Sequence, residues 1–476
     1  MEEARELVFM PGPGMGHLVA AVEMGKLLIN RDQRLSITYL IIDLPYDIGI
    51  NAYTHSISAS NLRFIHLPPP PKLTNPDQNR PPSLVYFDMM CSQQPKVRDT
   101  MQEIMKTSVS KVACVILDMF CVGMIDVGHE LGLPSYVFFT SSAAFLGLQF
   151  HSVRLSDEDN IDIAEYKDSD AELSVETFTN PVPAKVLPTP MVDRLTGGSK
   201  LVVDSVRKIL QAKGIMVNTF LELEPFSMKS LSTGKNPPVY PIGPVVNLAN
   251  QKKDSTYHDI MNFLDNQPPS SVVFLCFGSQ GWFPEDQVKE IAYALERSGC
   301  RFLWSLKRPP ADGSLDAPGE YGSPEEVLPG GFLERTLGIG KIIGNAPQVA
   351  ILSHPAIGGF VSHCGWNSIL ESFWFGVPIA AWPSYAEQQV NAFEIVVELG
   401  LGVDIRMDYR IENCKNVIVG ADEIESAISR LMMIDSEERK KVKELQNQSK
   451  KSLINGGSSY NNLGNLIKNI LGEYDV

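Results

Sequence analysis

Short runs of β-branched and aromatic residues alternate with helical patterns along this chain, and the alternation occurs in two separate series. The first series has expected helices at Val19–Ile29 and Lys96–Met105, between expected strands at Leu7–Met10, Ser36–Ile42, Val112–Leu117 and Ser135–Phe139. The second series has expected strands at Val272–Phe277, Phe302–Leu306, Lys341–Gly344, Gly358–His363 and Val377–Trp382. Continuous apolar strands separated by helices are typical of a parallel sheet covered on both faces. The sequence therefore predicts an α/β protein with two doubly wound halves.

The length of the chain agrees with two domains. Its 476 residues suggest two units of roughly 200 residues or more each. The stretch Pro241–Tyr257 is rich in Pro, Asn, Lys and Asp, which favours a boundary there. We expect domains at 1–245 and 246–457 and a last segment at 458–476, which has helical apolar spacing. Expected loops are the proline-rich His66–Ser83, the acidic Ser156–Pro183 and the Pro/Gly-rich Lys307–Gly331.

Charge and cysteine content narrow the possible partners and compartment. A net charge of −15 argues against nucleic acid and against an anionic membrane surface. No apolar stretch approaches the ~20 residues of a membrane span, and the acidic start Met1–Glu6 does not resemble a signal peptide. The seven cysteines are scattered and form no C-x-x-C pair, so we expect reduced thiols in a cytoplasmic protein.

The first candidate site is a glycine-rich turn that carries a histidine. The expected strand Leu7–Met10 runs into the sequence PGPGMGH, which ends at His17 and opens a helix. Ligands of open α/β sheets bind beyond the carboxyl ends of the strands, and Asp118 follows another strand at that same edge. A carboxylate at Asp118 could orient the His17 ring and stabilise its protonated form, as a general base requires. The alternative is that His17 caps a helix and Asp118 occupies a turn.

A dinucleotide-binding fold of an NAD-dependent oxidoreductase is a rival interpretation of this turn. Asp43 ends the second expected strand, where an acid that binds ribose would lie. The glycines, however, follow G-x-G-x-G and not G-x-G-x-x-G, and Pro11 and Pro13 remove backbone donors that would face a pyrophosphate. This interpretation ranks below the first.

The second candidate site lies where the expected strand Gly358–His363 passes through a tight turn into a helix. Asn367 and Ser368 are favourable N-cap residues, and a helix start with free N–H groups binds a diphosphate well. His363 can donate a hydrogen bond to a phosphate oxygen, and Glu371 shares a helix face with Asn367 and Ser368. Its carboxylate can accept bonds from both hydroxyls of a ribose.

Glu387 and Gln388 follow the next expected strand, Val377–Trp382. Their donors and acceptors suit sugar hydroxyls. Each residue alone fits ordinary capping or a solvated helix face, but together they make a more specific pattern.

The stretch Asn345–Gln388, NAPQVAILSHPAIGGFVSHCGWNSILESFWFGVPIAAWPSYAEQ, closely resembles the signature box of plant secondary-product UDP-glycosyltransferases of family 1. The PGPGMGH turn, Asp118, the segment Leu264–Ser279 and the SSYNNL start of the last helix extend the resemblance over nearly the whole chain. It implies a GT-B fold, in which two Rossmann-like domains face a cleft and the last helix crosses back to the N-terminal domain. It also implies inverting transfer of a sugar, most often glucose, from UDP-glucose as co-substrate, without a metal or other cofactor. The acceptor would be a small lipophilic molecule such as a flavonoid, phenolic or triterpenoid.

The resemblance also assigns roles to individual residues. It makes His17 the base and Asp118 its orienting acid. The donor contacts that it implies are Ser279, His363, Asn367 and Ser368 to phosphate, Glu371 to ribose, Ala346 and Gln348 to uracil, and Thr140, Trp366, Glu387 and Gln388 to the sugar.

Three positions depart from the family pattern. Asn345 stands where a tryptophan normally stacks on uracil, Ala20 replaces a frequent proline, and Trp282 replaces a smaller residue after the FGS turn. Loss of base stacking, worth about 1–3 kcal/mol, weakens donor binding by roughly 10- to 100-fold if nothing replaces it. Trp282 is expected either to pack on the donor or to narrow the acceptor cleft. An alternative function follows from Asn345, namely a weakly active or non-catalytic relative that binds an aglycone.

Overall fold

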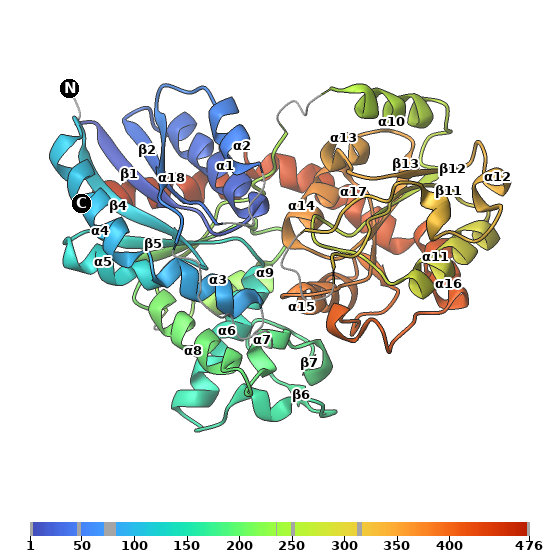
Figure 1. Ribbon diagram of the computed structural model, residues 1–476. Helices are drawn as coiled ribbons and strands as arrows, with labels where there is room; N and C mark the ends of the chain where they lie inside the picture. The colour runs from blue at the N-terminus through green and yellow to red at the C-terminus, as the bar shows by residue number, and fades with distance from the viewer. Residues whose placement is uncertain are drawn as a thin grey trace.

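The computed structural model describes residues 3–44, 49–70, 82–234, 236–248, 253–311 and 317–473. Two parallel sheets form its centre, one in each half of the chain (Figure 1). The first sheet has the strand order β3-β2-β1-β4-β5-β8-β9 and the second the order β12-β11-β10-β13-β14-β15. Each half is a three-layer α/β unit, and together they have the architecture of the GT-B fold.

The strands of the first sheet are β1 (Arg5–Met10), β2 (Leu35–Ile42), β3 (Leu62–Leu67), β4 (Lys111–Asp118), β5 (Ser135–Phe139), β8 (Gly214–Val217) and β9 (Val239–Pro241). Those of the second sheet are β10 (Val272–Cys276), β11 (Arg301–Ser305), β12 (Gly340–Ile343), β13 (Ile357–Ser362), β14 (Ile379–Ala381) and β15 (Gly402–Asp404). A small antiparallel pair, β6 (Glu172–Leu173) and β7 (Val182–Pro183), lies apart from both sheets.

The helices of the N-terminal half are α1 (Met15–Arg31), α2 (Ile50–Ser56), α3 (Pro82–Cys91), α4 (Gln94–Thr107), α5 (Ile125–Glu130), α6 (Ala143–Asp157), α7 (Thr189–Val192), α8 (Gly198–Ile209) and α9 (Pro225–Leu231). Those of the C-terminal half are α10 (Ser255–Asp265), α11 (Glu285–Ser298), α12 (Phe332–Arg335), α13 (Gln348–Leu352), α14 (Trp366–Phe375), α15 (Gln388–Phe393), α16 (Ala421–Leu431) and α17 (Glu437–Ser452). A π-helical turn, Glu394–Glu398, continues α15, and α18 (Ser458–Leu471) ends the chain.

All nine predicted strands lie at or within two residues of observed strands. Eight of them are buried apolar runs, whereas β12 lies at the edge of the second sheet and is mostly half-buried. The sequence missed β3, β8, β9 and β15 of the parallel sheets and the short strands β6 and β7. Strand β3 includes His66, so the expected loop His66–Ser83 begins too early, and α3 begins at Pro82; residues 71–81 lie outside the described part. The segments Ser156–Pro183 and Lys307–Gly331 contain only short elements, among them the bridge between Arg308 and Gly319.

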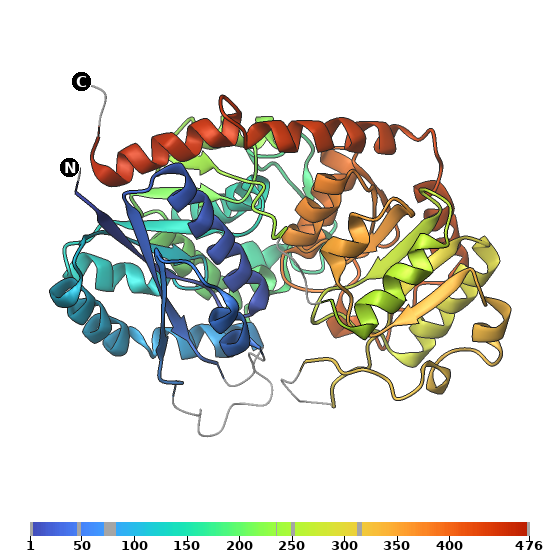
Figure 2. The same ribbon diagram turned by 90° about the horizontal axis from the view of Figure 1, so that it is seen from above.

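The last helix belongs spatially to the first half. Figure 2 shows α17 and α18, in red, running along one side of the molecule from the C-terminal half across to the N-terminal half. Four apolar residues of α18 join the hydrophobic core that α1 forms with the first sheet: Leu463, Leu466, Ile467 and Ile470. Tyr136 Oη donates to Asn469 Oδ1 at 2.7 Å. The limits at 245 and 457 stay a prediction.

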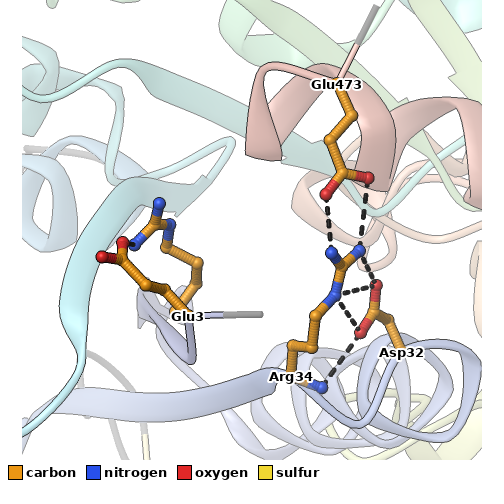
Figure 3. Close-up of polar contacts among 5 residues, drawn as sticks. Glu3, Asp32, Arg34 and Glu473 are labelled. Carbon is orange, nitrogen blue, oxygen red and sulfur yellow. Dashed lines mark hydrogen bonds and ion pairs between the residues drawn. The ribbon is translucent and has the colours of Figure 1, made fainter. Parts of the chain in front are cut away.

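An ion pair attaches the C-terminal end of α18 to the first half. Arg34, which follows α1, donates from Nη1 to Glu473 Oε1 at 2.6 Å and from Nη2 to Asp32 Oδ2 at 2.6 Å (Figure 3). The guanidinium carbon of Arg31 lies 4.1 Å from the ring centre of Tyr460. These contacts fasten α18 to α1 at both of its ends.

Candidate active site

The carboxyl ends of the two sheets face each other. Asn367, in α14, donates from Nδ2 to the carbonyl of Gly16 at 3.3 Å, which joins the second half to the glycine turn after β1. The indole N–H of Trp366 donates to the carbonyl of Asn218, after β8, at 2.7 Å. Groups that follow β1 and β8 in the first half therefore meet groups that follow β13 in the second half.

His17, Asp118 and Thr140 form one polar cluster at the N-terminal side of this junction. His17 Nδ1 lies 2.9 Å from Asp118 Oδ2 and 3.1 Å from Thr140 Oγ1. Asp118 is completely buried and also accepts the backbone N–H of Phe120 at 3.0 Å. A buried carboxylate beside Nδ1 holds the ring proton on that nitrogen and leaves the basic lone pair on Nε2. The arrangement suits a general base.

Gly12 makes room for this cluster. A Cβ atom at position 12 would lie 2.3 Å from Asp118 Oδ1, so any side chain there would displace the carboxylate. The ring of Phe120 packs against His17 edge to face, with 5.1 Å between ring centres. The base therefore has an apolar neighbour on one side.

A second cluster lies after β10 and β13. The His363 side chain is buried, its Nδ1 has no hydrogen-bond partner among the described residues, and burial lowers its pKa to about 4. Gly278 has φ of 76°, and a Cβ atom there would lie 2.6 Å from His363 Nε2. The ring is thus neutral at physiological pH and lies against backbone that no side chain covers, as a close approach of phosphate requires.

Gln348, Ser368 and Glu371 form a third cluster between α13 and α14. The Gln348 amide donates to Ser368 Oγ at 2.9 Å and to Glu371 Oε2 at 2.7 Å. Burial raises the pKa of the Glu371 carboxyl to about 7, and the bond from Gln348 opposes that rise. The predicted uracil, phosphate and ribose residues of these two helices are therefore in mutual contact.

The start of α14 differs from the prediction. Asn367 and Ser368 do not cap the helix; Gly365 is the N-cap, and no side chain bonds the helix start. The chain turns through Cys364, whose φ of 61° is left-handed, and the helix begins two residues earlier than an N-cap at Asn367 would give. Asn367 and Ser368 thus lie in the first turn, beside the free N–H groups. Trp366 has already committed its indole N–H to Asn218 and offers only its backbone N–H there.

Glu387 and Gln388 open α15 at the boundary of the two halves (Figure 1). Gln388 Oε1 accepts the backbone N–H groups of Ser384 and Tyr385, each at 3.0 Å, and the Gln388 side chain also bonds the Tyr385 hydroxyl. Glu387 Oε1 accepts the hydroxyl of Ser141 at 3.3 Å. Ser141 follows Thr140 directly, and this places the expected sugar residues beside the base.

Comparison with known proteins identifies the family. A family model described as UDP-glucoronosyl and UDP-glucosyl transferase matches residues 235–415. UDP-glucose flavonoid 3-O-glucosyltransferase 6 of Fragaria ananassa is 49% identical, with 99% of each chain covered. This chain belongs to the plant family 1 UDP-glycosyltransferases. UDP-glycosyltransferase 71A15 of Malus domestica is 50% identical over 99% of this chain and 100% of its own.

Solved structures agree with this assignment. The Medicago truncatula UGT71G1 complexed with UDP-glucose is 42% identical, covers 98% of each chain and superimposes with a TM-score of 0.87. A Siraitia grosvenorii transferase in complex with UDP is 45% identical, with a TM-score of 0.89 and coverage of 98% of this chain and 100% of that one. The glycosyltransferase therefore has the GT-B fold, and a UDP-sugar is its co-substrate. The oxidoreductase interpretation is wrong, and the Asp43 carboxylate lies 3.0 Å from His66 Nδ1.

The three positions at which this glycosyltransferase departs from the family pattern differ in burial and in their contacts. The Asn345 side chain is exposed, and its backbone N–H donates to Glu320 Oε1 at 3.0 Å. Trp282 is partly buried against the core of the second half, and Ala20 is buried in α1. Ala346 is partly buried, whereas Ser279 is exposed and its carbonyl accepts Lys307 Nζ at 3.1 Å.

Sequence reasoning missed Ser141, Lys307 and Tyr385. Lys307 follows β11 near Ser279, and burial lowers its pKa. The Tyr385 ring lies 6.4 Å from the His363 ring, centre to centre, and burial raises its pKa to about 12. Only their positions in the sequence could have indicated these three residues, since each one directly follows a strand end or lies near a predicted site residue.

Among the residues that the structure describes, no three His, Cys, Asp or Glu side chains are grouped so as to hold a metal ion. In the same part of the chain, no helix is both long and apolar enough to cross a membrane. The seven cysteines are free thiols, and five of them are buried.

Proposed function

We propose that this enzyme transfers glucose from UDP-glucose to a hydroxyl group of a small lipophilic acceptor, with inversion at the anomeric carbon. The contact of His17 Nδ1 with the buried Asp118 carboxylate, at 2.9 Å, carries this proposal. Relatives named for flavonoid and anthocyanidin glucosylation support glucose as the sugar and a flavonoid or related phenolic as the acceptor. The free thiols fit a cytoplasmic enzyme.

The proposed reaction is a single displacement. Nε2 of His17 accepts the proton of the acceptor hydroxyl while Asp118 holds the ring and stabilises its positive charge. The acceptor oxygen attacks the anomeric carbon, a new C–O bond forms, and the bond to UDP breaks with its electron pair leaving on the diphosphate. The N–H groups at the start of α14 and the neutral His363 ring would stabilise that charge. A β-glycoside and UDP result from an α-linked donor, and His17 returns its proton to solvent.

Within this proposal the donor lies along the second half. Ala346 and Gln348 take the uracil, Glu371 the ribose, and Ser279, His363, Asn367 and Ser368 the diphosphate. Thr140, Glu387, Gln388 and the start of α14 at Trp366 take the sugar. The mutual contacts of Gln348, Ser368 and Glu371 support one continuous nucleotide site.

UDP release from UDP-glucose, measured with flavonoid, phenolic and triterpenoid acceptors, tests the proposal. We expect acceptor-dependent release that falls by at least about 100-fold in His17→Ala with an alcohol acceptor. His129→Ala, which removes an exposed histidine of α5, is the matched control. Full activity of His17→Ala would refute the base. If none of the acceptors in the panel produces UDP release, the aglycone-binding alternative is favoured, and Asn345 would then be the first position to change.

A further inference from the structure

Two buried carboxyl groups meet at the boundary of the two halves, behind the expected sugar residues. Glu224 stands before α9 in the N-terminal half, and Glu394 begins the π-helical turn after α15 in the C-terminal half. Their side chains are only 2% and 1% exposed. The two carboxyl groups lie within hydrogen-bonding reach of each other.

The surroundings provide few donors for these carboxyl oxygens. Glu224 Oε1 accepts the backbone N–H of Ala144 at 2.8 Å. No regular hydrogen bond reaches Glu224 Oε2 or either oxygen of Glu394 from the described residues, and contacts with the hydroxyls of Thr219 and Ser142 only partly offset the effect of burial on their pKa values. Two ionised carboxylates in such a place would repel each other strongly, whereas one proton between them makes a hydrogen bond.

The ionisable groups that act on this pair favour the protonated form. Burial raises the pKa of both carboxyl groups, and the charge of Glu224 raises that of Glu394 further. Glu398, on the same π-helical turn, also raises the pKa of Glu394. Against the effect of burial, hydrogen bonds from Thr179 and Asn180 lower the pKa of Glu398 itself, so its charge is present at neutral pH.

The pair is connected to the reacting groups through three consecutive hydroxyl residues after β5. Thr140 contacts His17, Ser141 donates to Glu387, and Ser142 caps α6 and faces Glu394. Glu394 follows Glu387 by seven residues, so both lie on the face of α15 that meets this segment. The carboxyl pair thus holds the end of the helix whose start carries Glu387 and Gln388.

Other contacts seat this helix on the first half. Val390 and Phe393 belong to the hydrophobic core of the N-terminal half, and the Phe393 ring lies 5.9 Å from the Phe178 ring, centre to centre. Glu398 Oε2 accepts the backbone N–H of Asn180 at 3.0 Å. Along the chain, the carboxyl pair lies between these two contacts. Of the three contacts, the carboxyl pair is the one in which loss of a proton replaces an attraction by a repulsion.

We propose that Glu224 and Glu394 share one proton across the boundary of the two halves, and that this proton positions Glu387 and Gln388 against the sugar of the donor. The inference rests on the proposed function for the identity of the sugar residues. Glu224 and Glu394 are positioning residues, since they act through α15. Loss of the shared proton at alkaline pH separates the halves and weakens donor binding.

The pH dependence of UDP-glucose binding, measured by calorimetry between pH 7.5 and pH 10, tests this proposal. In the wild type we expect the dissociation constant to rise about tenfold or more across this range, because two facing charges replace one hydrogen bond. In Glu394→Gln the amide donates to Glu224 at every pH, so the dissociation constant should stay within about twofold. Glu444→Gln, an exposed position on α17, should follow the wild type.

A rise in Glu394→Gln parallel to that of the wild type would overturn the proposal. Circular dichroism establishes whether Glu394→Gln is folded. If Glu394→Gln is not folded, Glu224→Gln takes its place, and we expect the same constant dissociation constant across this pH range. Infrared spectroscopy of the wild type at pH 8 gives a separate test, because the proposal requires the C=O band of a protonated carboxyl that disappears in the glutamine variant; absence of that band refutes it. Binding does not require His17, so failure here is distinct from failure of the proposed base.

Discussion

The base cluster in the first half and the donor clusters in the second half differ in whether their buried polar atoms have hydrogen-bond partners. Asp118 is fully buried, yet its two oxygens contact His17 and the backbone of Phe120. In the second half, His363 Nδ1 and Asn367 Oδ1 are buried without a partner among the described residues. Buried polar atoms without partners are costly, so they mark a surface made for a polar ligand. The first region is organised before substrate arrives, whereas the second needs the nucleotide to complete it.

Asp118→Asn should impair the base cluster of the first region, and we expect this substitution to have the largest effect on activity. An asparagine amide can donate to Nδ1 and so place the ring proton on Nε2, where the base is needed. We expect kcat with an alcohol acceptor to fall by about 10²- to 10⁴-fold, while UDP binding stays within about twofold. Asp435→Asn, at an exposed position, is the control. Weaker UDP binding with normal kcat would place Asp118 in the donor site instead.

Glu371→Gln should act on the second region alone. In the proposed ribose contact an ionised Glu371 accepts both hydroxyls, and burial raises the pKa of this carboxyl to about 7. The donor KM of the wild type should therefore rise as pH falls through 7, by roughly tenfold at one unit below the pKa. In Glu371→Gln the donor KM should be about 10- to 100-fold higher than in the wild type at pH 8, and independent of pH between 6 and 8. A kcat loss larger than the KM change would contradict a role limited to binding.

The same residue gives a prediction on stability. The folded protein keeps the Glu371 proton above the ordinary pKa of 4.5, whereas the unfolded chain loses it there. The stabilising contribution is therefore complete below pH 4.5 and is lost as pH rises through about 7. Thermal unfolding of Glu371→Gln should lack this part of the pH dependence, and identical slopes for both proteins would refute the raised pKa.

Asn345→Trp should strengthen the second region. A tryptophan ring can stack on uracil, and stacking on a base is worth about 1–3 kcal/mol. We expect the dissociation constant of UDP to fall by about tenfold or more, with kcat at saturating donor unchanged. Asn345→Ala separates stacking from loss of the asparagine and should bind UDP like the wild type. No gain in Asn345→Trp would contradict the loss of uracil stacking at this position.

Arg34→Ala provides the smallest expected effect, since the residue lies outside both regions. Exposed ion pairs contribute about 0–1 kcal/mol, so the unfolding temperature should fall by only a few degrees, and neither kcat nor UDP binding should change. Leu466→Ala is the contrasting variant, because it empties part of the core under α18 and should cost about 2–5 kcal/mol. Equal losses for the two variants would contradict this ranking.

The sequence predicted the central strands and most of the candidate residues, because both have local signals. β1, β4, β10 and β13 are apolar runs long enough to recognise, and His17 and Asp118 follow two of them. β15 has only three residues, and Arg63 and His66 interrupt the apolar run of β3, so neither stands out.

What the sequence could not give depends on contacts between distant segments. The left-handed turn at Cys364 places the start of α14 two residues before the predicted cap at Asn367, and no residue type there requires it. Glu224 and Glu394 are ordinary glutamates in the sequence, and only the docking of the two halves makes them a pair. Ser141 and Lys307 likewise become visible only when the sheet ends meet.

The return of α18 to the first half has a consequence for synthesis. Leu463, Leu466, Ile467 and Ile470 complete a core whose other members lie within the first 245 residues. During translation the first sheet emerges long before these residues, so part of one of its faces stays uncovered until the ribosome reaches the end of the message. A chain truncated before Ser458 would leave the part of this apolar face that α1 does not cover exposed to solvent, and such exposed apolar surface favours aggregation.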